Sequence, residues 1–580
     1  MFNLLDSQRQ GLTRMLELSA GKDIQWKVLV YDKHGQEIIA PLLNVGALRN
    51  LGVTLHLPLH SDRQALPEVP VVYFIDPTDE NLARVVSDID RNLYEAVYLN
   101  FTSSITKQAL EMFAKNLSPP VRIQRVVDRL CAFISLSQST FSLSLPTSYT
   151  LLHNSQASEA SIGHLTDKIA EGVFCAILAS RNVPIIRCAP GGASELVARK
   201  VNSRIRDFII SGGPAASEIL TPSAASLGGS AQRPLLMLLD REVDLTGMLN
   251  HTWTYQALLH DVLALRGDHL RVDGKDYYID SAGDTFFEKH AAAPFPEVAT
   301  AVNDHVAEFK QKQAAIGDDK SGGLSAAVHA MPGLTDAKKR IDFHTTVATS
   351  LLSEIGKRRL DRYFEFETEV GRKSISSSLA ELTELGKSGS LTDQARAIFS
   401  FLLCKSRELN QGQVDALVKQ LQSNTEDLSP GVKYIRYLAS VRNMADTASS
   451  GKEVVDAPAA GFVKGLISVG MQNIKNILPT KEEMPVTKQL ESAMDQQPGS
   501  EKLLYFDPKT ASHVDSEAVP RFKGIFRSGM VFIVGGGNYV EAQNVQAYAS
   551  LSGKEIVYGA TDFVSPVEFA RELVVLGRSI

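Results

Sequence analysis

The stretch PLLMLLDREVDLTGMLNHTWTYQALLHDVLAL, residues 234–265, decides how this chain is organised. Residues 235–239 form an apolar run of strand length behind a proline, which predicts a buried strand. From about Asn250 onward, apolar residues recur every three or four positions, which predicts a long amphipathic helix. The joint between these two elements contains the charged residues Asp240, Arg241 and Asp244.

The charged joint has two interpretations. Asp240 and Asp244 could be metal ligands or an acid/base pair. Alternatively, one of these carboxylates caps the following turn and pairs with Arg241, which would fix the angle between strand and helix. No cluster of histidine and cysteine lies nearby, and metal sites usually need more than two carboxylates. The structural interpretation is favoured, and we expect no catalytic residue, metal or cofactor here.

Composition limits the class of protein. The chain has 580 residues, which predicts three or four domains, and a formal net charge of −6, which gives no reason to expect nucleic acid as the main ligand. Nowhere do about 18 apolar residues follow one another, so any membrane association should be peripheral. Four scattered cysteines without C-x-x-C spacing indicate a reducing, cytoplasmic compartment: Cys131, Cys175, Cys188 and Cys404.

Two regions alternate between strand and helix patterns, which predicts mostly parallel sheets covered by helices. In the first region, short β-branched or aromatic runs predict strands at residues 26–31, 53–57, 71–75 and 96–101. The second region predicts a helix at 161–181, a strand at 183–187 and the strand at 235–239. Pro214 to Gln232 is rich in Ser, Ala and Gly and is expected to be a flexible connection.

Helical periodicity dominates from Phe295 to about Asn473, after a short hairpin predicted around residues 273–275. Two long helical patterns at about 297–356 predict an αα-hairpin. Its tip, residues 316–334, contains Pro332 and several glycines and should bend or fray. A loose polar stretch is expected at 481–501 and onward to Pro508. Strand patterns then return at 531–534 and 556–559, so a helical domain is inserted into one α/β sheet.

Two glycine groups invite a comparison with phosphate-binding loops. Gly191-Gly192 opens a predicted helix, and Gly535-Gly536-Gly537 follows the strand at 531–534. Neither completes a P-loop or a G-x-G-x-x-G fingerprint. Tight turns are therefore the favoured interpretation, and a nucleotide-using α/β enzyme remains an alternative. Scattered histidines such as His251 and His344 are interpreted as surface or satisfied core residues.

LLDREVDL at 238–245 and HTWTYQALLHDVL at 251–263 resemble the signature of the SM family, the SNARE-binding partners of syntaxins. The resemblance covers nearly the whole chain and is similar in detail to the Sly branch, which serves traffic between endoplasmic reticulum and Golgi. The supporting phrases are KVLVYDKHGQEIIAPLL, LGVTLHLPLHSDRQALPEVPVVYFIDPT, PIIRCAPGGASELVA, FPEVA, LTDAKKRIDFHTTVATSLLSEI, VFIVGGGNYVE and IVYGATD.

The resemblance implies a three-domain arch without enzymatic activity. Domain 1 would span 1–137, domain 2 would combine 138–245 with 481–580, and domain 3 would be the helical insertion 246–480. The implied protein is a cytoplasmic monomer, peripherally recruited to ER and Golgi membranes. Its implied partners are a syntaxin-type Qa-SNARE, an R-SNARE, the assembled SNARE complex and tethering factors. A helical tether or coat subunit is the alternative from another class, although it would not explain two α/β domains.

The resemblance also implies binding residues. A pocket for the N-terminal peptide of a syntaxin would be lined by Leu110, Phe113, Ala114 and Ile123. Ile341 and Thr345 would lie on the hairpin face that binds SNARE helices. Residues 316–334 would form a lid over that face, held down by an apolar side consisting of Leu324, Val328 and Met331.

Overall fold

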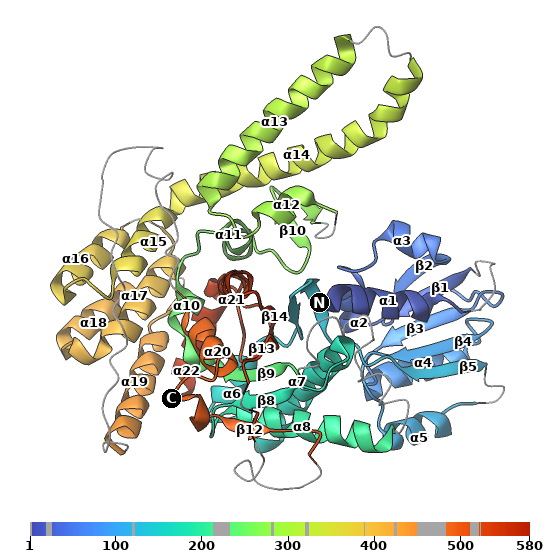
Figure 1. Ribbon diagram of the computed structural model, residues 1–580, viewed down its shortest axis with the longest axis horizontal. Helices are drawn as coiled ribbons and strands as arrows, with labels where there is room; N and C mark the ends of the chain where they lie inside the picture. The colour runs from blue at the N-terminus through green and yellow to red at the C-terminus, as the bar shows by residue number, and fades with distance from the viewer. Residues whose placement is uncertain are drawn as a thin grey trace.

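The computed structural model describes residues 3–18, 26–118, 122–212, 233–279, 283–318, 324–387, 389–422, 426–448, 483–510, 521–522 and 524–580. Within these ranges, side chains are described except at 312–318, 324–334, 336 and 442–448. Figure 1 shows two regions with sheets side by side, a bundle of helices at the end opposite the first sheet, and a long hairpin projecting from the molecule.

The first sheet has five parallel strands in the order β2-β1-β3-β4-β5. Its strands are β1 (Lys27–Tyr31), β2 (Val53–Pro58), β3 (Val71–Ile75), β4 (Val97–Phe101) and β5 (Ile123–Asp128). One face packs against α1 (Leu4–Leu16), α2 (Lys33–Ile39) and α3 (Val45–Asn50), and the other against α4 (Asp79–Asp90) and α5 (Lys107–Lys115). The four predicted strands are present. The edge strand β5 was not predicted.

The second sheet has seven strands in the order β12-β8-β9-β13-β14-β7-β6. They are β6 (Ile134–Ser137), β7 (Thr140–Ser142), β8 (Ile185–Cys188), β9 (Leu235–Asp240), β12 (Leu504–Phe506), β13 (Ser528–Val534) and β14 (Glu555–Ala560). Strand β9 lies between β8 and β13, and both pairings are parallel. The predicted strand at 235–239 is thus the place where the two distant parts of the chain join. The sheet begins at Ile134, ahead of the boundary expected at residue 137.

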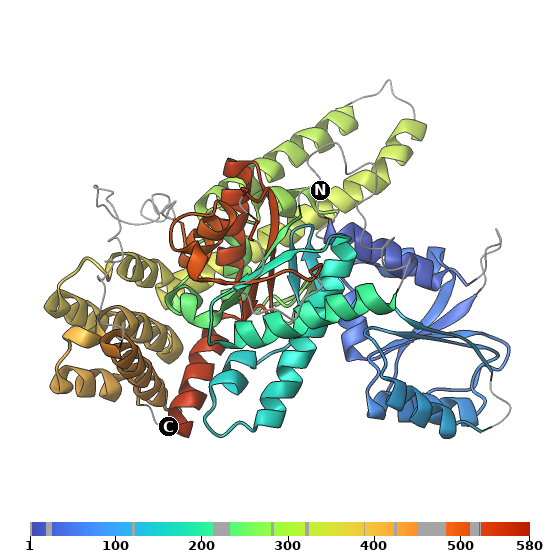
Figure 2. The ribbon, with the colours of Figure 1, turned by 60° about the horizontal axis from the view of Figure 1, so that its bottom comes forward.

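Helices cover both faces of the second sheet (Figure 2). One cluster joins the sheet to α7 (Glu159–Ser180) and α8 (Ala193–Ser211), and another joins its opposite face to α20 (Pro485–Met494) and α21 (Tyr539–Ser552). The loose stretch expected at 481–501 was therefore wrong. Val486, Leu490 and Met494 recur at helical spacing and are fully buried, which stabilises a helix despite its polar neighbours.

The long amphipathic helix expected from about Asn250 onward is shorter in the structure and begins only at Tyr255. The structure has a short 3₁₀ turn η2 (Arg241–Val243), α10 (Thr246–Leu249) and α11 (Tyr255–Val262). Between α10 and α11, the backbone N–H of His251 donates to the carboxylate of Glu367 at 2.6 Å, and the carbonyl of Asn250 accepts from Arg396. These tertiary hydrogen bonds take the place of helical ones at Asn250 and His251. The sequence pattern alone does not show which tertiary partners compete for the backbone.

The inserted part is mostly helical. The predicted hairpin is present as the antiparallel pair β10 (His269–Val272) and β11 (Lys275–Tyr278), whose turn residues Asp273 and Gly274 have φ of 50° and 77°. The other elements are α12 (Thr285–His290), α13 (Phe295–Asp318), α14 (Leu324–Arg358), α15 (Leu360–Glu369), α16 (Ile375–Leu385), α17 (Leu391–Lys405), η3 (Ser406–Glu408), α18 (Gln411–Gln420) and α19 (Pro430–Ala448).

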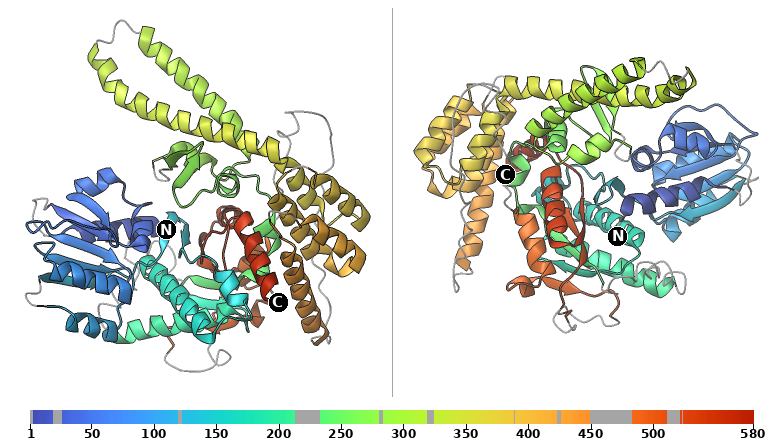
Figure 3. Two further views of the ribbon diagram at one scale, coloured as in Figure 1. Left: turned by 180° about the vertical axis from the view of Figure 1, so that it is seen from behind. Right: turned by 45° about the horizontal axis from the view of Figure 1, so that its top comes forward.

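Helices α13 and α14 form the projecting hairpin (Figure 3). The lid loop expected at 316–334 differs from the structure, since α13 continues to Asp318 and α14 begins at Leu324 and includes Pro332. Proline and glycine penalties are local, and helical residues on both sides outweigh them. The side chains of Leu324, Val328 and Met331 lie outside the described part of the structure.

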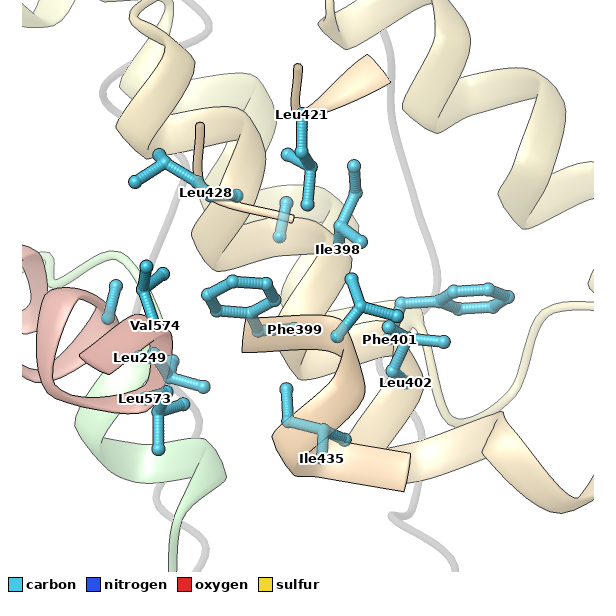
Figure 4. Close-up of a cluster of buried hydrophobic side chains, with 14 of the residues drawn as sticks. Leu249, Ile398, Phe399, Phe401, Leu402, Leu421, Leu428, Ile435, Leu573 and Val574 are labelled. Atoms are coloured by element: carbon cyan, nitrogen blue, oxygen red, sulfur yellow. The ribbon is translucent and has the colours of Figure 1, made fainter. Parts of the chain in front are cut away.

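The helical bundle closes on α17, which is buried on nearly all sides. Figure 4 shows its residues Phe399 and Leu402 among side chains from α10, α19 and the last helix, α22 (Pro566–Ser579). The remaining elements are α6 (Ser148–His153) and η6 (Ser500–Lys502). Among the helices that the structure describes, none combines the length and the apolar character that a membrane crossing requires.

Candidate binding surfaces and the interdomain joint

Arg241 is the centre of the charged joint and is completely buried. Its Nη1 and Nη2 atoms donate to the two carboxylate oxygens of Glu541 at 2.9 and 2.5 Å. The same nitrogens donate to the carbonyls of Gly536 and Asp244 at 3.1 and 2.7 Å. Burial lowers the pKa of Arg241, but the charge of Glu541 and its hydrogen bonds outweigh burial and raise this pKa. Arg241 therefore ties the end of β9 to the first turn of α21.

The two aspartates of the joint have different partners. Asp240 accepts hydrogen bonds from the backbone N–H and the hydroxyl of Ser194, at 2.8 and 2.6 Å, in the first turn of α8. Asp244 accepts from the backbone N–H of Gly247 at 2.8 Å. The structural role predicted for the cluster fits these contacts, and Asp244 caps the next turn as expected. The predicted pairing of Arg241 with an Asp carboxylate was wrong, because its partner is Glu541.

Both glycine groups lie in tight turns. Gly535 and Gly536 have φ of 103° and 101°, which other residues rarely adopt, and their N–H groups donate to Thr561 Oγ1 at 3.3 and 2.8 Å. At the other group, the N–H of Gly191 donates to the carboxylate of Glu195 at 2.7 Å, and the N–H of Ser194 donates to Asp240. A phosphate would therefore find these donors occupied.

Helix α5 presents part of the predicted peptide pocket. The hydroxyl oxygen of Thr106 accepts from the N–H of Ala109 at 3.1 Å and so caps this helix. Leu110 is 39% exposed and Ala114 is exposed as well, one turn apart on the surface. Phe113 is only 4% exposed and packs into the core beneath the sheet. The structure therefore places Phe113 under the expected pocket and not in its lining. Successive helical residues are rotated by about 100°, so Phe113 can face the core while Ala114 faces solvent.

Edge strand β5 extends the apolar surface beside α5. Ile123 is partly buried and packs on the same cluster as Phe113. Val126, which was not predicted, is 42% exposed and pairs in register with Leu99 of that cluster. Both β5 side chains thus lie on the sheet face that α5 covers, because their register partners Val97 and Leu99 belong to the cluster of Phe113. Strict alternation along β5 would not have found Val126, because the pairing with β4 shifts register between Ile123 and Arg125.

The two residues predicted on the hairpin differ in environment. Thr345 is exposed on α14, and its hydroxyl donates to the carbonyl of Ile341 at 2.7 Å. Ile341 is partly buried and lines a pocket of about 190 Å³ between α12, α13 and α14. Thr349 and Leu352 are exposed on the same side of α14 as Thr345, and Leu352 is 44% exposed. Ile341 lies one turn before Thr345 on the same side of α14 but is less exposed, because it lines this pocket.

A buried network of charged residues fixes the base of the hairpin. His251 Nδ1 lies 2.8 Å from Glu367 of α15, and its Nε2 lies 3.3 Å from Asp393 of α17. Arg358, at the end of α14, donates to both Asp393 oxygens at 2.9 and 2.5 Å. Arg359 then adopts a left-handed conformation with φ of 56° and ends α14. The network thus holds the last turn of the hairpin against the bundle.

The network is neutral only when His251 is protonated. Arg396 makes a bidentate pair with Asp261 at 2.9 Å for both contacts and lies 3.6 Å from Asp393. Three carboxylates, on Asp261, Glu367 and Asp393, thus face two arginines and His251. Burial and the Arg396 charge lower the pKa of His251, but its carboxylate partners outweigh them and raise it. His251 is thus a satisfied core histidine, which is one of the two environments predicted for it, although its partners were not predicted.

Among the residues that the structure describes, no group of three or more His, Cys, Asp or Glu side chains is arranged so that it could hold a metal ion. The family model of the Sec1 family matches residues 27–572. Together with two parallel sheets, a discontinuous second sheet and a helical insertion, this match defines the class: the chain belongs to the Sec1 family.

Individual relatives indicate which branch of the Sec1 family this chain is similar to. The mouse Sec1 family domain-containing protein 1 is 33% identical, over 99% of this chain and 98% of the relative. The protein sly1 homolog of Drosophila melanogaster is also 33% identical, over 100% and 99%. The crystal structure of Sly1p in complex with an N-terminal peptide of Sed5p matches with a TM-score of 0.81 at 28% identity, covering 100% of this chain and 99% of that one. This chain is thus similar to Sly1-type proteins over its full length, which confirms the predicted family branch.

Proposed function

We propose that this protein is an SM-type regulator of vesicle fusion that binds a syntaxin-type Qa-SNARE through its N-terminal peptide. The observation that carries the proposal is the full-length match to Sly1p, which was crystallised with such a peptide from Sed5p. The exposed apolar surface of Leu110, Ala114, Ile123 and Val126 supports the location, because aliphatic side chains left in water favour an apolar partner. The similarity to Sly1-type proteins supports a role in ER–Golgi transport, with recruitment from the cytoplasm.

A matched pair of variants on α5 tests this site. Leu110→Arg places a charge on the apolar surface, and Met112→Arg places the same charge on the opposite side of the same helix, where Met112 is 52% exposed. Burying an unpaired charge costs at least about 2 kcal/mol, so the Kd of Leu110→Arg should rise about 30-fold or more. Met112→Arg should bind as the parent chain does.

Calorimetric titration with a synthetic peptide of the Sed5p N-terminus gives the measurement, and circular dichroism checks that both variants fold. Absence of saturable binding to the parent chain would reject the peptide-binding function. Equal losses in the two variants, or none in Leu110→Arg, would reject the surface.

We propose that the outer face of α14 binds a SNARE helix during assembly of the complex, with an R-SNARE as a further partner. Thr345, Thr349 and Leu352 are exposed at four- and three-residue spacing, which suits helix-on-helix docking. Leu352→Asp should slow SNARE assembly in a reconstituted fusion assay. The control variant Ser353→Asp, at the exposed neighbouring residue, should leave the rate of SNARE assembly unchanged. Equal assembly rates for Leu352→Asp and the parent chain would refute this role. The lid function of Leu324, Val328 and Met331 stays a prediction.

A further inference from the structure

The helical bundle carries a groove that shares no lining residue with either proposed SNARE surface. It has a volume of about 690 Å³ and lies between α18, α19 and the end of α22. Its apolar floor consists of Val414, Val418 and Val432. Tyr437 lines the groove and is 48% exposed, and Val441 continues the same side of α19 at 43% exposure. The inner face of α19 packs in the bundle core through Ile435 (Figure 4), so the groove lies on the outer face.

The groove is lined by cations that lack carboxylate partners. Lys433, Arg436 and Arg578 line it, against a single acidic residue, Asp415. Arg436 Nη1 donates to the amide oxygen of Gln411 at 3.0 Å, and Arg578 Nη2 donates to a backbone carbonyl at 3.2 Å. Among the residues that the structure describes, no carboxylate lies within ion-pair distance of these three cations. Arginine and tyrosine are the residue types that most often dominate binding energy at protein interfaces.

The geometry restricts how a partner can bind. Helices form every wall, so no strand edge is available for an extended peptide to pair with. The lining of α19 runs from Pro430 to Ser440, which is about 15 Å of helix. A helix of about three turns fits that length and can place apolar residues on the valine floor.

We infer that this groove binds a short amphipathic helix with an acidic rim, presented by a partner protein. The partner's apolar residues would contact Val414, Val418 and Tyr437, and its carboxylates would pair with Lys433, Arg436 and Arg578. The chain's own residues 449–482, which follow α19, contain four lysines against three acidic residues and do not complement this charge. A partner helix is therefore the better occupant.

The test uses the full chain and a fluorescent synthetic peptide of 16 residues, with leucines at helical spacing and glutamates beside them. A second peptide replaces every glutamate with glutamine. Anisotropy titration should show at least tenfold tighter binding of the glutamate peptide at low salt, with the difference shrinking as salt rises. Equal binding of the two peptides would overturn the inference.

Variants of the chain locate the site. The double substitution Lys433→Glu with Arg436→Glu should weaken binding at least tenfold, and Tyr437→Ala at least fivefold. Lys419→Glu, exposed on α18 outside the groove, is the matched control and should bind normally. Undiminished binding by the double variant would overturn the inference. Retained binding of the Sed5p peptide shows that the variants fold and keeps this test independent of the syntaxin site.

Two further measurements exclude other occupants. Deletion of residues 452–478 should leave peptide affinity unchanged. A tenfold increase after the deletion would show that the chain's own segment occupies the groove and would overturn the inference. Sedimentation with phosphatidylserine vesicles should show no binding that depends on Lys433 and Arg436. Vesicle binding that the double variant loses would assign the groove to a membrane surface instead.

Discussion

Asp244 should destabilise the native protein at neutral pH, so that Asp244→Asn is a stabilising substitution. Asp244 is 9% exposed, and burial together with the nearby charge of Glu541 raises its pKa from 3.8 to about 6. A raised carboxyl pKa means that the folded protein binds a proton more tightly than the unfolded chain does. The stability that this proton contributes to the folded protein is fully present below pH 3.8 and is lost as the pH rises through about 6. Asparagine keeps an oxygen that accepts from Gly247.

The magnitude follows from the pKa difference. At 1.36 kcal/mol for each pKa unit, ionising Asp244 costs the folded state about 3 kcal/mol above pH 7. Asp244→Asn should therefore raise the thermal midpoint of the affected unfolding transition by about 6 to 12 °C at pH 7.5. At pH 5 the parent residue is largely protonated when folded, so the gain should fall to about half.

Thermal unfolding followed by circular dichroism at pH 7.5 and pH 5 measures both quantities. Asp342→Asn, which removes an exposed carboxylate on α14, is the control and should change stability by less than about 0.5 kcal/mol. An Asp244→Asn protein no more stable than its parent at pH 7.5 would refute the reasoning. So would a gain that is as large at pH 5.

Two other predictions concern buried contacts. The raised pKa of His251 contributes stability below about pH 6.5, and this is lost as the pH rises through the folded-state pKa. Urea unfolding of His251→Gln between pH 6 and 9 should accordingly show a flatter pH dependence than the parent, and an unchanged slope would contradict the protonated network. Gly577→Ala would push a methyl group into the backbone of Pro430 where α22 meets α19. It should lower the thermal midpoint by the equivalent of about 1–3 kcal/mol, whereas Gly163→Ala, which meets open space, should not.

The sequence predicts elements better than it predicts partners. The strand at 235–239 was placed to within one residue, because a short apolar run behind a proline has few other structures available. The helical insertion followed from the change between strand and helix periodicity. Helix α20 was missed because polar residues surround its few apolar positions, and only burial against the sheet shows that they stabilise a helix.

Side-chain partners could not be predicted for a simple reason. Arg241 and Glu541 are separated by 300 positions, and a single sequence contains no signal that joins them. The same limit applies to the helix face that meets a sheet. Spacing groups Leu110, Phe113 and Ala114 on one side of α5, but only the neighbouring sheet determines that Phe113 points inward. Candidate surfaces from spacing alone therefore mix exposed and core residues.

Helix α17 connects the proposed surfaces of the helical domain. Its Asp393 holds Arg358 at the base of the hairpin, while its Phe399 packs in the core with Ile435 on the inner face of α19 (Figure 4). The base of the hairpin and the inner face of α19 thus pack against the same helix, whose tightly packed interior resists deformation. A linked pair of ligands, one for the outer face of α14 and one for the groove, would gain affinity only if its linker matches the span between the two surfaces.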